Sequence, residues 1–137
     1  MRLLALDHGA ARCGCAVCDP TETIVRPLAS IGKPDSPAGL DAIADLADEQ
    51  EAELVIVGLP LLAGGEEGAQ AAAARAFAGR LGAKLSVGIE LFDERYTTRM
   101  AQASAAAGAT ADEDSLAAAH LLEEFIARRG ESKVNDE

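Results

Sequence analysis

Residues 3–20 read LLALDHGAARCGCAVCDP, and this stretch decides the fold. An apolar run over residues 3–6 ends at Asp7. A second strand candidate spans residues 12–18 and ends at an Asp-Pro turn signal. Gly9 and two alanines separate the two runs, which predicts a tight hairpin. The stretch therefore predicts two antiparallel strands with an acid near the end of the first.

Alternating strand and helix patterns follow this hairpin. A predicted strand over residues 24–31 is interrupted by Pro27, which suits the edge of a sheet. The continuous apolar run 54–57 is typical of a strand that is covered on both faces. The remaining patterns predict a strand at 85–92 and helices with apolar stripes near 40–47, 74–81, 97–107 and 110–127.

This order of elements indicates one α/β domain over residues 1–128, with a mixed five-stranded sheet and helices on both faces. Residues 129–137 are polar and charged, which predicts a disordered tail. In sheets of this kind, ligands bind outside the carboxyl ends of the strands. We therefore expect a functional site at that edge.

The charge of the chain gives a conflicting signal about partners. The formal net charge is -11, which taken alone argues against nucleic-acid binding, because phosphate contacts come from Lys and Arg. A local group of arginines can still bind phosphate against an acidic background. The chain also lacks an apolar run of about 18 residues and a signal peptide, so we expect no membrane span and a cytoplasmic location.

Three cysteines, Cys13, Cys15 and Cys18, alternate within the second predicted strand. Zinc sites usually combine a Cys-x-x-Cys pair with a second, distant pair, and none follows here. We interpret the three residues as structural thiols in a strand. Redox sensing and metal binding remain alternatives for them.

Three acids stand where a site at the carboxyl edge of the sheet would form. Asp7 ends the first strand, Glu94 follows the strand at 85–92, and Asp114 lies about one turn into the last helix. Asp114 shares a helical face with the apolar residues Ala118 and Leu121, so we expect it to point toward the sheet.

Converging carboxylates repel each other unless a cation joins them. Mg²⁺ prefers oxygen ligands, and a pair of such ions can activate water against a phosphodiester. The pattern therefore predicts a site for Mg²⁺ or Mn²⁺ at Asp7, Glu94 and Asp114.

Each acid also has a simpler interpretation. Asp7 could close the hairpin turn, Glu94 could pair with Arg95 or Arg99, and Asp114 could complement the helix dipole. Strand alternation puts the neighbouring Asp93 on the face opposite Glu94, and whether Asp93 is a metal ligand stays open.

Arginines near the acids are candidate phosphate contacts. Arg12 follows the hairpin, while Arg95, Thr97 and Arg99 lie where the predicted strand at 85–92 gives way to a helix. Arginine side chains and a helix N-terminus both suit phosphate. Ordinary surface charge and a threonine N-cap are the alternative explanation.

Several segments resemble motifs of one known family. Residues 7–20 resemble the opening D-x-G-x-K-R-I-G-V-A-x-S-D-P of the YqgF/RuvX family, and the Arg-Pro-Leu of residues 26–28 continues it. Residues 57–60 and 65–68 resemble its V-G-L-P and G-S-E-G segments. The other matching segments are 93–98, similar to D-E-R-L-T-T, and 114–118, similar to D-S-x-A-A. The resemblance runs from residue 3 to about residue 126.

This resemblance implies an RNase H-like fold related to Holliday junction resolvases. It also implies the role usually assigned to the family, which is nuclease processing of the 5′ end of pre-16S rRNA; resolution of branched DNA is the competing role. By motif, Asp7, Glu94 and Asp114 become metal-binding catalytic acids, and Arg12, Arg95 and Thr97 become substrate contacts. The chain departs from the family at Ala11, where the family has Lys, and at the three cysteines, which replace Ile, Val and Ser.

Other functions remain open from the sequence. The fold could be retained in a nucleic-acid or protein binding module without catalysis, which the acidic balance and Ala11 favour. The Asp7-x-Gly9 turn also resembles a phosphate motif of actin-like ATPases, but those proteins need two such domains. The sequence leaves both a monomer and a homodimer open, and junction resolution would require a symmetric dimer.

Overall fold

The computed structural model describes residues 1–93 and 113–135, with side chains of the second segment as far as residue 129. Its elements are β1 (Leu3–His8), β2 (Arg12–Cys18), β3 (Val25–Pro27), β4 (Ile31–Gly32), α1 (Pro37–Glu49), β5 (Leu54–Leu59), α2 (Ala69–Gly82), β6 (Gly88–Asp93) and α4 (Glu113–Asn135). The helix predicted near 97–107 lies outside the described residues.

The strands form one mixed sheet in the order β3-β2-β1-β5-β6, with β4 also paired to β2. The hairpin of β1 and β2 is antiparallel, whereas β5 is parallel to both β1 and β6. The carboxyl ends of β1, β5 and β6 therefore lie at one edge of the sheet, as expected from the sequence.

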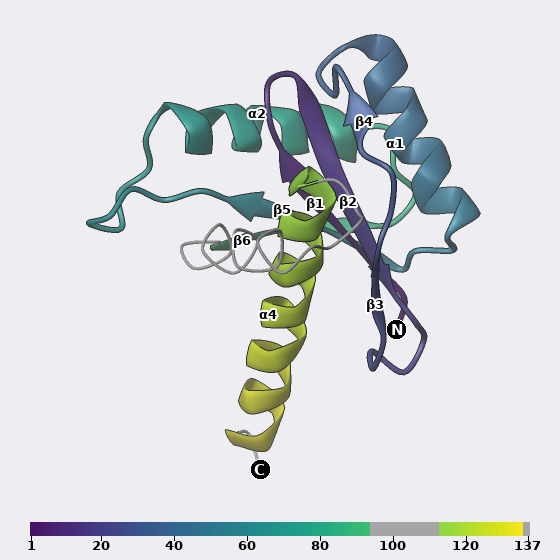
Figure 1. The fold of residues 1–137 in the computed structure, drawn as a ribbon, viewed down its shortest axis with the longest axis vertical. Helices are drawn as coiled ribbons and strands as arrows, with labels where there is room; N and C mark the ends of the chain where they lie inside the picture. Colours follow the sequence, from purple (N-terminus) through teal and green to yellow (C-terminus); the bar gives the residue numbers. More distant parts are fainter. Residues whose placement is uncertain (94–112, 136–137) are drawn as a thin grey trace.

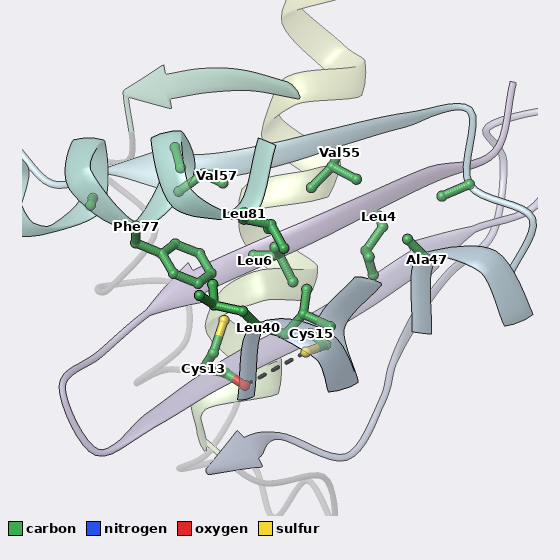
Figure 2. Packing of buried hydrophobic residues seen from close by; sticks show 14 of the residues in the cluster. Leu4, Leu6, Cys13, Cys15, Leu40, Ala47, Val55, Val57, Phe77 and Leu81 are labelled. Carbon is green, nitrogen blue, oxygen red and sulfur yellow. Dashed lines mark hydrogen bonds between the residues drawn. The ribbon is translucent and has the colours of Figure 1, made fainter. Parts of the chain in front are cut away.

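Helices lie on both faces of the sheet (Figure 1), and an apolar layer on each face holds them there. One layer lies between the sheet and helices α1 and α2, and Figure 2 shows part of it, including Leu4, Leu6 and Phe77. The other lies between the opposite face and α4, where Leu121 and Leu122 are fully buried. Helices on both faces confirm the predicted architecture.

Local sequence explains where the first helix begins. Ser36 is the N-cap of α1, because its hydroxyl oxygen accepts a hydrogen bond from the Gly39 amide at 3.0 Å. Pro37 follows at the first helical position, where its missing amide hydrogen costs nothing. The buried face of the helix then presents Leu40 and Ile43 to the sheet.

Two sequence predictions need correction. The single strand predicted over 24–31 is two short strands, β3 and β4, which both pair with β2, so the sheet has a sixth strand. Helix α4 continues to Asn135, well past the predicted end near residue 127, so the tail expected to be disordered from residue 129 is helical as far as residue 135. Among the described residues, no helix has the length and apolar character needed to cross a membrane.

Candidate active site

Asp7 occupies the face of β1 that helix α4 covers. Leu3 and Ala5 pack in the α4 layer, whereas Leu4 and Leu6 pack in the opposite layer. Because side chains alternate along a strand, Asp7 shares the face of Leu3 and Ala5. Asp7 is half-buried there, next to the start of α4.

Gly14 is the residue that brings α4 close to Asp7. It lies directly opposite Asp7 in the hairpin register. A Cβ atom added at Gly14 would stand 1.8 Å from the backbone oxygen of Asp114 and 2.7 Å from the backbone nitrogen of Ser115. Only glycine permits this approach, so the first turn of α4 rests on β2 beside Asp7.

A hydrogen bond fixes the same turn of α4. The hydroxyl oxygen of Ser115 accepts from the Cys15 amide at 3.3 Å, and Ser115 is fully buried. Asp7 and Asp114 therefore flank Gly14 on one face of the sheet. The structure brings together these two of the three predicted acids.

Arg12 reaches the same place. Its Nε atom lies 3.3 Å from the Oδ2 atom of Asp114, and the two side chains are 64% and 37% exposed. The predicted helical face is confirmed by Ala118 and Leu121, which are fully buried. Asp114 itself lies at the rim of this face, where both the sheet and solvent can reach its carboxylate.

Both acids contribute to the raised pKa of the Cys13 thiol. A hydrogen bond with Cys15 and burial are the main causes that raise the Cys13 pKa well above its usual value, and the charges of Asp7 and Asp114 raise this pKa further. All three cysteines are unpaired and buried in β2, as the strand interpretation predicted. Figure 2 shows Cys13 and Cys15 within the apolar layer.

Asp93, the last residue of β6, lies away from this group. Ile89 and Leu91 of β6 pack in the α1 and α2 layer, so alternation places Asp93 on the face opposite Asp7. The remaining predicted site residues, Glu94, Arg95, Thr97 and Arg99, lie outside the described residues.

His8 points away from the acids, into the opposite layer. Its ring stacks on Phe77 with 4.6 Å between ring centroids, and its Nε2 atom lies 2.8 Å from Oδ2 of Asp35. Arg80 of α2 donates to the other oxygen of Asp35 at 2.6 Å. Sequence reasoning missed Asp35 and Arg80, since they are 27 and 45 residues from their partners in the chain and no spacing pattern links them.

The two converging acids suit a hard divalent cation. Carboxylate oxygens are the ligands that Mg²⁺ prefers, and Mg²⁺ commonly binds through one or two carboxylates and keeps several waters. Within residues 1–93 and 113–135, no group of three or more His, Cys, Asp or Glu side chains lies close enough together to bind one metal ion. The described donors therefore fit Mg²⁺ or Mn²⁺ with two carboxylates, Asp7 and Asp114.

Comparison with known proteins places this geometry in a family. A family model described as "RuvX: Holliday junction resolvase" matches residues 1–128. A protein of Anaeromyxobacter sp. (strain K), named "Putative pre-16S rRNA nuclease", is 39% identical over 135 residues, covering 94% of this chain and 98% of its own. A protein of the same name from Thermobifida fusca (strain YX) is 45% identical over 108 residues, covering 78% of this chain and 67% of its own.

The fold also matches that of a solved structure. The structure of T. thermophilus RuvC in complex with a Holliday junction substrate has a TM-score of 0.59 and 18% identity, covering 95% of this chain and 96% of that one. This likeness supports an RNase H-like fold. With the family model matching nearly its whole length, the chain belongs to the RuvX Holliday junction resolvase family.

Proposed function

We propose that the protein is a metal-dependent nuclease that processes the 5′ end of pre-16S rRNA in the cytoplasm. The observation that carries this proposal is the meeting of Asp7 and Asp114 at Gly14, with Arg12 beside them. The names of its relatives supply the substrate. Asp7 and Asp114 are the two predicted catalytic acids among the described residues, and Arg12 is a predicted substrate contact.

Each residue has a defined part in this proposal. Asp7 and Asp114 would hold Mg²⁺ or Mn²⁺ through their carboxylate oxygens, and Glu94 is the third acid that we assign to the set. The bound ion would supply an activated water for direct hydrolysis of a phosphodiester, without a covalent enzyme intermediate.

Arg12 and three further residues are assigned to phosphate binding. Arg12 is 64% exposed beside Asp114, so its guanidinium can reach a phosphate as well as the carboxylate. We assign Arg95, Thr97 and Arg99 to the same phosphate path. These arginines would supply the phosphate contacts that a chain with a net charge of -11 needs to bind nucleic acid.

Cleavage of a precursor rRNA fragment with Mg²⁺ or Mn²⁺ tests this function. Asp7→Asn should lower the rate by more than about 100-fold, since even groups outside the ligand shell of a metal change activity by about 10–100-fold. Asp93→Asn is the matched control, because Asp93 lies at the same edge of the sheet on the other face, and it should keep most of the rate.

The same assay on a four-way DNA junction tests the second function. The family description names junction resolution, which would need a symmetric dimer to cut two strands. If a dimer cleaves both strands of the junction and leaves precursor rRNA intact, junction resolution is the function and rRNA processing is not. Full cleavage by Asp7→Asn would refute the site, and the absence of any cleavage by the wild type would indicate a binding module.

A further inference from the structure

A hollow lies at the carboxyl end of β1, on the side that faces α2. It has a volume of about 470 Å³, within the range of small-molecule sites. Its walls come from the hairpin turn, the loop before α1, the end of β5 and the first turns of α2. We call it the α2 cleft, and its lining residues are Asp7, His8, Gly9, Ala10, Asp35, Pro60, Ala69, Gln70 and Ala73.

The α2 cleft is open because the residues around it are small. Ala69 and Ala73 lie one turn apart on α2 and face the cleft together with Ala10 of the hairpin turn and Pro60. These side chains give aliphatic walls with no charge. A flat, neutral group such as an aromatic ring suits such walls better than a hydrated anion does.

Asp35 provides a fixed hydrogen-bond acceptor in the cleft. Its two oxygens receive hydrogen bonds from His8 at 2.8 Å and from Arg80 at 2.6 Å. Burial acts to raise the pKa of Asp35, but the two hydrogen bonds outweigh it and lower the pKa, so Asp35 is an anion at neutral pH. An ionised carboxylate only accepts, so Nε2 of His8 carries the proton.

The charge and the free acceptor sites define the ligand. A carboxylate has about four acceptor positions, of which two are used here, so Asp35 can still accept from a ligand N–H group. The same charge repels phosphate. Gln70 adds an amide that can both donate and accept. The α2 cleft therefore suits a planar, neutral group with N–H donors on its edge.

We propose that the α2 cleft binds an unpaired nucleobase next to the phosphodiester that is cleaved. The inference rests on the proposed nuclease function. Asp7 borders the cleft at the carboxyl end of β1, while its side chain lies on the α4 face of the sheet with Asp114. A strand held by the acid pair that crosses this edge of the sheet can therefore place a neighbouring base in the cleft. Proteins read unpaired bases by contact with their faces and by hydrogen bonds to their edges. The donor-rich edges of guanine, adenine and cytosine fit Asp35.

Binding of RNA in EDTA tests the cleft without cleavage. The probe is a fluorescent precursor rRNA fragment in which the nucleotides around the processing site are made abasic one at a time. We expect one abasic position to weaken wild-type binding by about 10-fold, in the range measured for one protein–base contact. Ala73→Leu should fill the cleft and remove this difference. Ala72→Leu, an exposed residue of α2 that is not part of the cleft, should keep it.

A second variant separates filling of the cleft from loss of its polar contacts. Gln70→Ala leaves the cleft open and should reduce the effect of the abasic position without abolishing RNA binding. The inference is overturned if no abasic position weakens wild-type binding, or if Ala73→Leu remains as sensitive to it as Ala72→Leu. Cleavage with Mg²⁺ is measured separately. If the wild type cleaves RNA but no abasic position weakens its binding, the cleft proposal fails while the nuclease function stands; if the wild type does not cleave RNA, the nuclease function itself fails.

Discussion

The backbone of Gly14 in β2 lies against the backbone of Asp114 in α4, and a Cβ atom at Gly14 would stand 1.8 Å from the Asp114 oxygen. This contact sets the position of Asp114 relative to Asp7, the strand partner of Gly14. The close packing of a hairpin and a helix end thus determines whether two acids on distant segments can act together.

We expect Gly14→Ala to push α4 away from β2. Overpacking of this kind usually costs about 1–3 kcal/mol, and the displaced Asp114 should also weaken metal binding. Urea unfolding and calorimetric titration with Mn²⁺ measure the two effects. Gly32→Ala in β4 is the control, since a Cβ atom there meets nothing within 4 Å. Equal stability and metal affinity of both variants would show that α4 is not held at this point.

A second prediction concerns Arg12. Its guanidinium competes with a metal ion for the Asp114 carboxylate, but exposed ion pairs contribute only about 0–1 kcal/mol. Arg12→Ala should therefore bind Mn²⁺ slightly more tightly, by up to about fivefold. The same variant should bind RNA less tightly, with a salt dependence that is shallower by about one unit.

Lys84→Ala is the control for this prediction, because Lys84 pairs with Asp41 on the side of the sheet covered by α1 and α2. It should change neither binding constant. An Arg12→Ala variant with unchanged salt dependence of RNA binding would restrict Arg12 to the ion pair with Asp114.

The sequence was sufficient for the parts of the fold that depend on local patterns. Alternation and turn residues predicted the hairpin of β1 and β2, and the apolar run at residues 54–57 predicted β5. The strand over 24–31 was wrong because periodicity does not show where pairing with β2 is interrupted. The ladder ends at Pro27 with one further hydrogen bond, from the Leu28 amide to the Cys15 oxygen, and pairing with β2 resumes at β4, opposite Arg12 and Cys13.

The length of α4 and the α2 cleft depend on contacts between distant residues. Arg128 lies over the Phe92 ring at 5.0 Å, and Arg129 reaches Glu22 at 3.4 Å, so the polar end of α4 is tied to β6 and to the loop between β2 and β3. Composition alone indicated disorder there. The link from His8 through Asp35 to Arg80 of α2 could not be predicted either, because it joins residues that are distant in the sequence and no local motif marks any of them.

A third prediction uses the cysteines. The hydrogen bond with Cys15 and burial raise the pKa of Cys13, and burial is the main cause that raises the pKa of Cys18. Because the thiolate is the reactive form, the native protein should react slowly with an aromatic disulfide reagent at pH 8, whereas the urea-unfolded chain should release three equivalents quickly.

Cys18→Ser identifies which thiol reacts first. Cys18 lies near the end of β2 with its Sγ atom 3.4 Å from the Met1 carbonyl oxygen, so fraying of the N-terminus should expose it before the other two. The slow native reaction should therefore lose its first phase in this variant. Rapid modification of Cys13 in the folded protein would support the redox interpretation instead.

The last prediction concerns acid stability and Asp35. The pKa of Asp35 is lowered in the folded protein, so its contribution to stability is fully present above the unfolded value of about 3.9 and is lost as the pH falls through the lower folded value. Asp35→Asn should lower the free energy of unfolding by about 1 kcal/mol at pH 7, a modest value because the carboxylate is 37% exposed. Below pH 4 this difference in stability should shrink, because the wild type loses the same contribution when Asp35 is protonated. Thermal unfolding from pH 7 to pH 3 measures how the stabilities of the variant and the wild type converge.

Asp45→Asn is the control, because Asp45 is an exposed residue of α1 outside the ion pairs of the described part of the chain. Its stability should differ from that of the wild type by the same amount at every pH. A constant gap between Asp35→Asn and the wild type across this range would mean that the hydrogen bonds from His8 and Arg80 do not depend on the Asp35 charge.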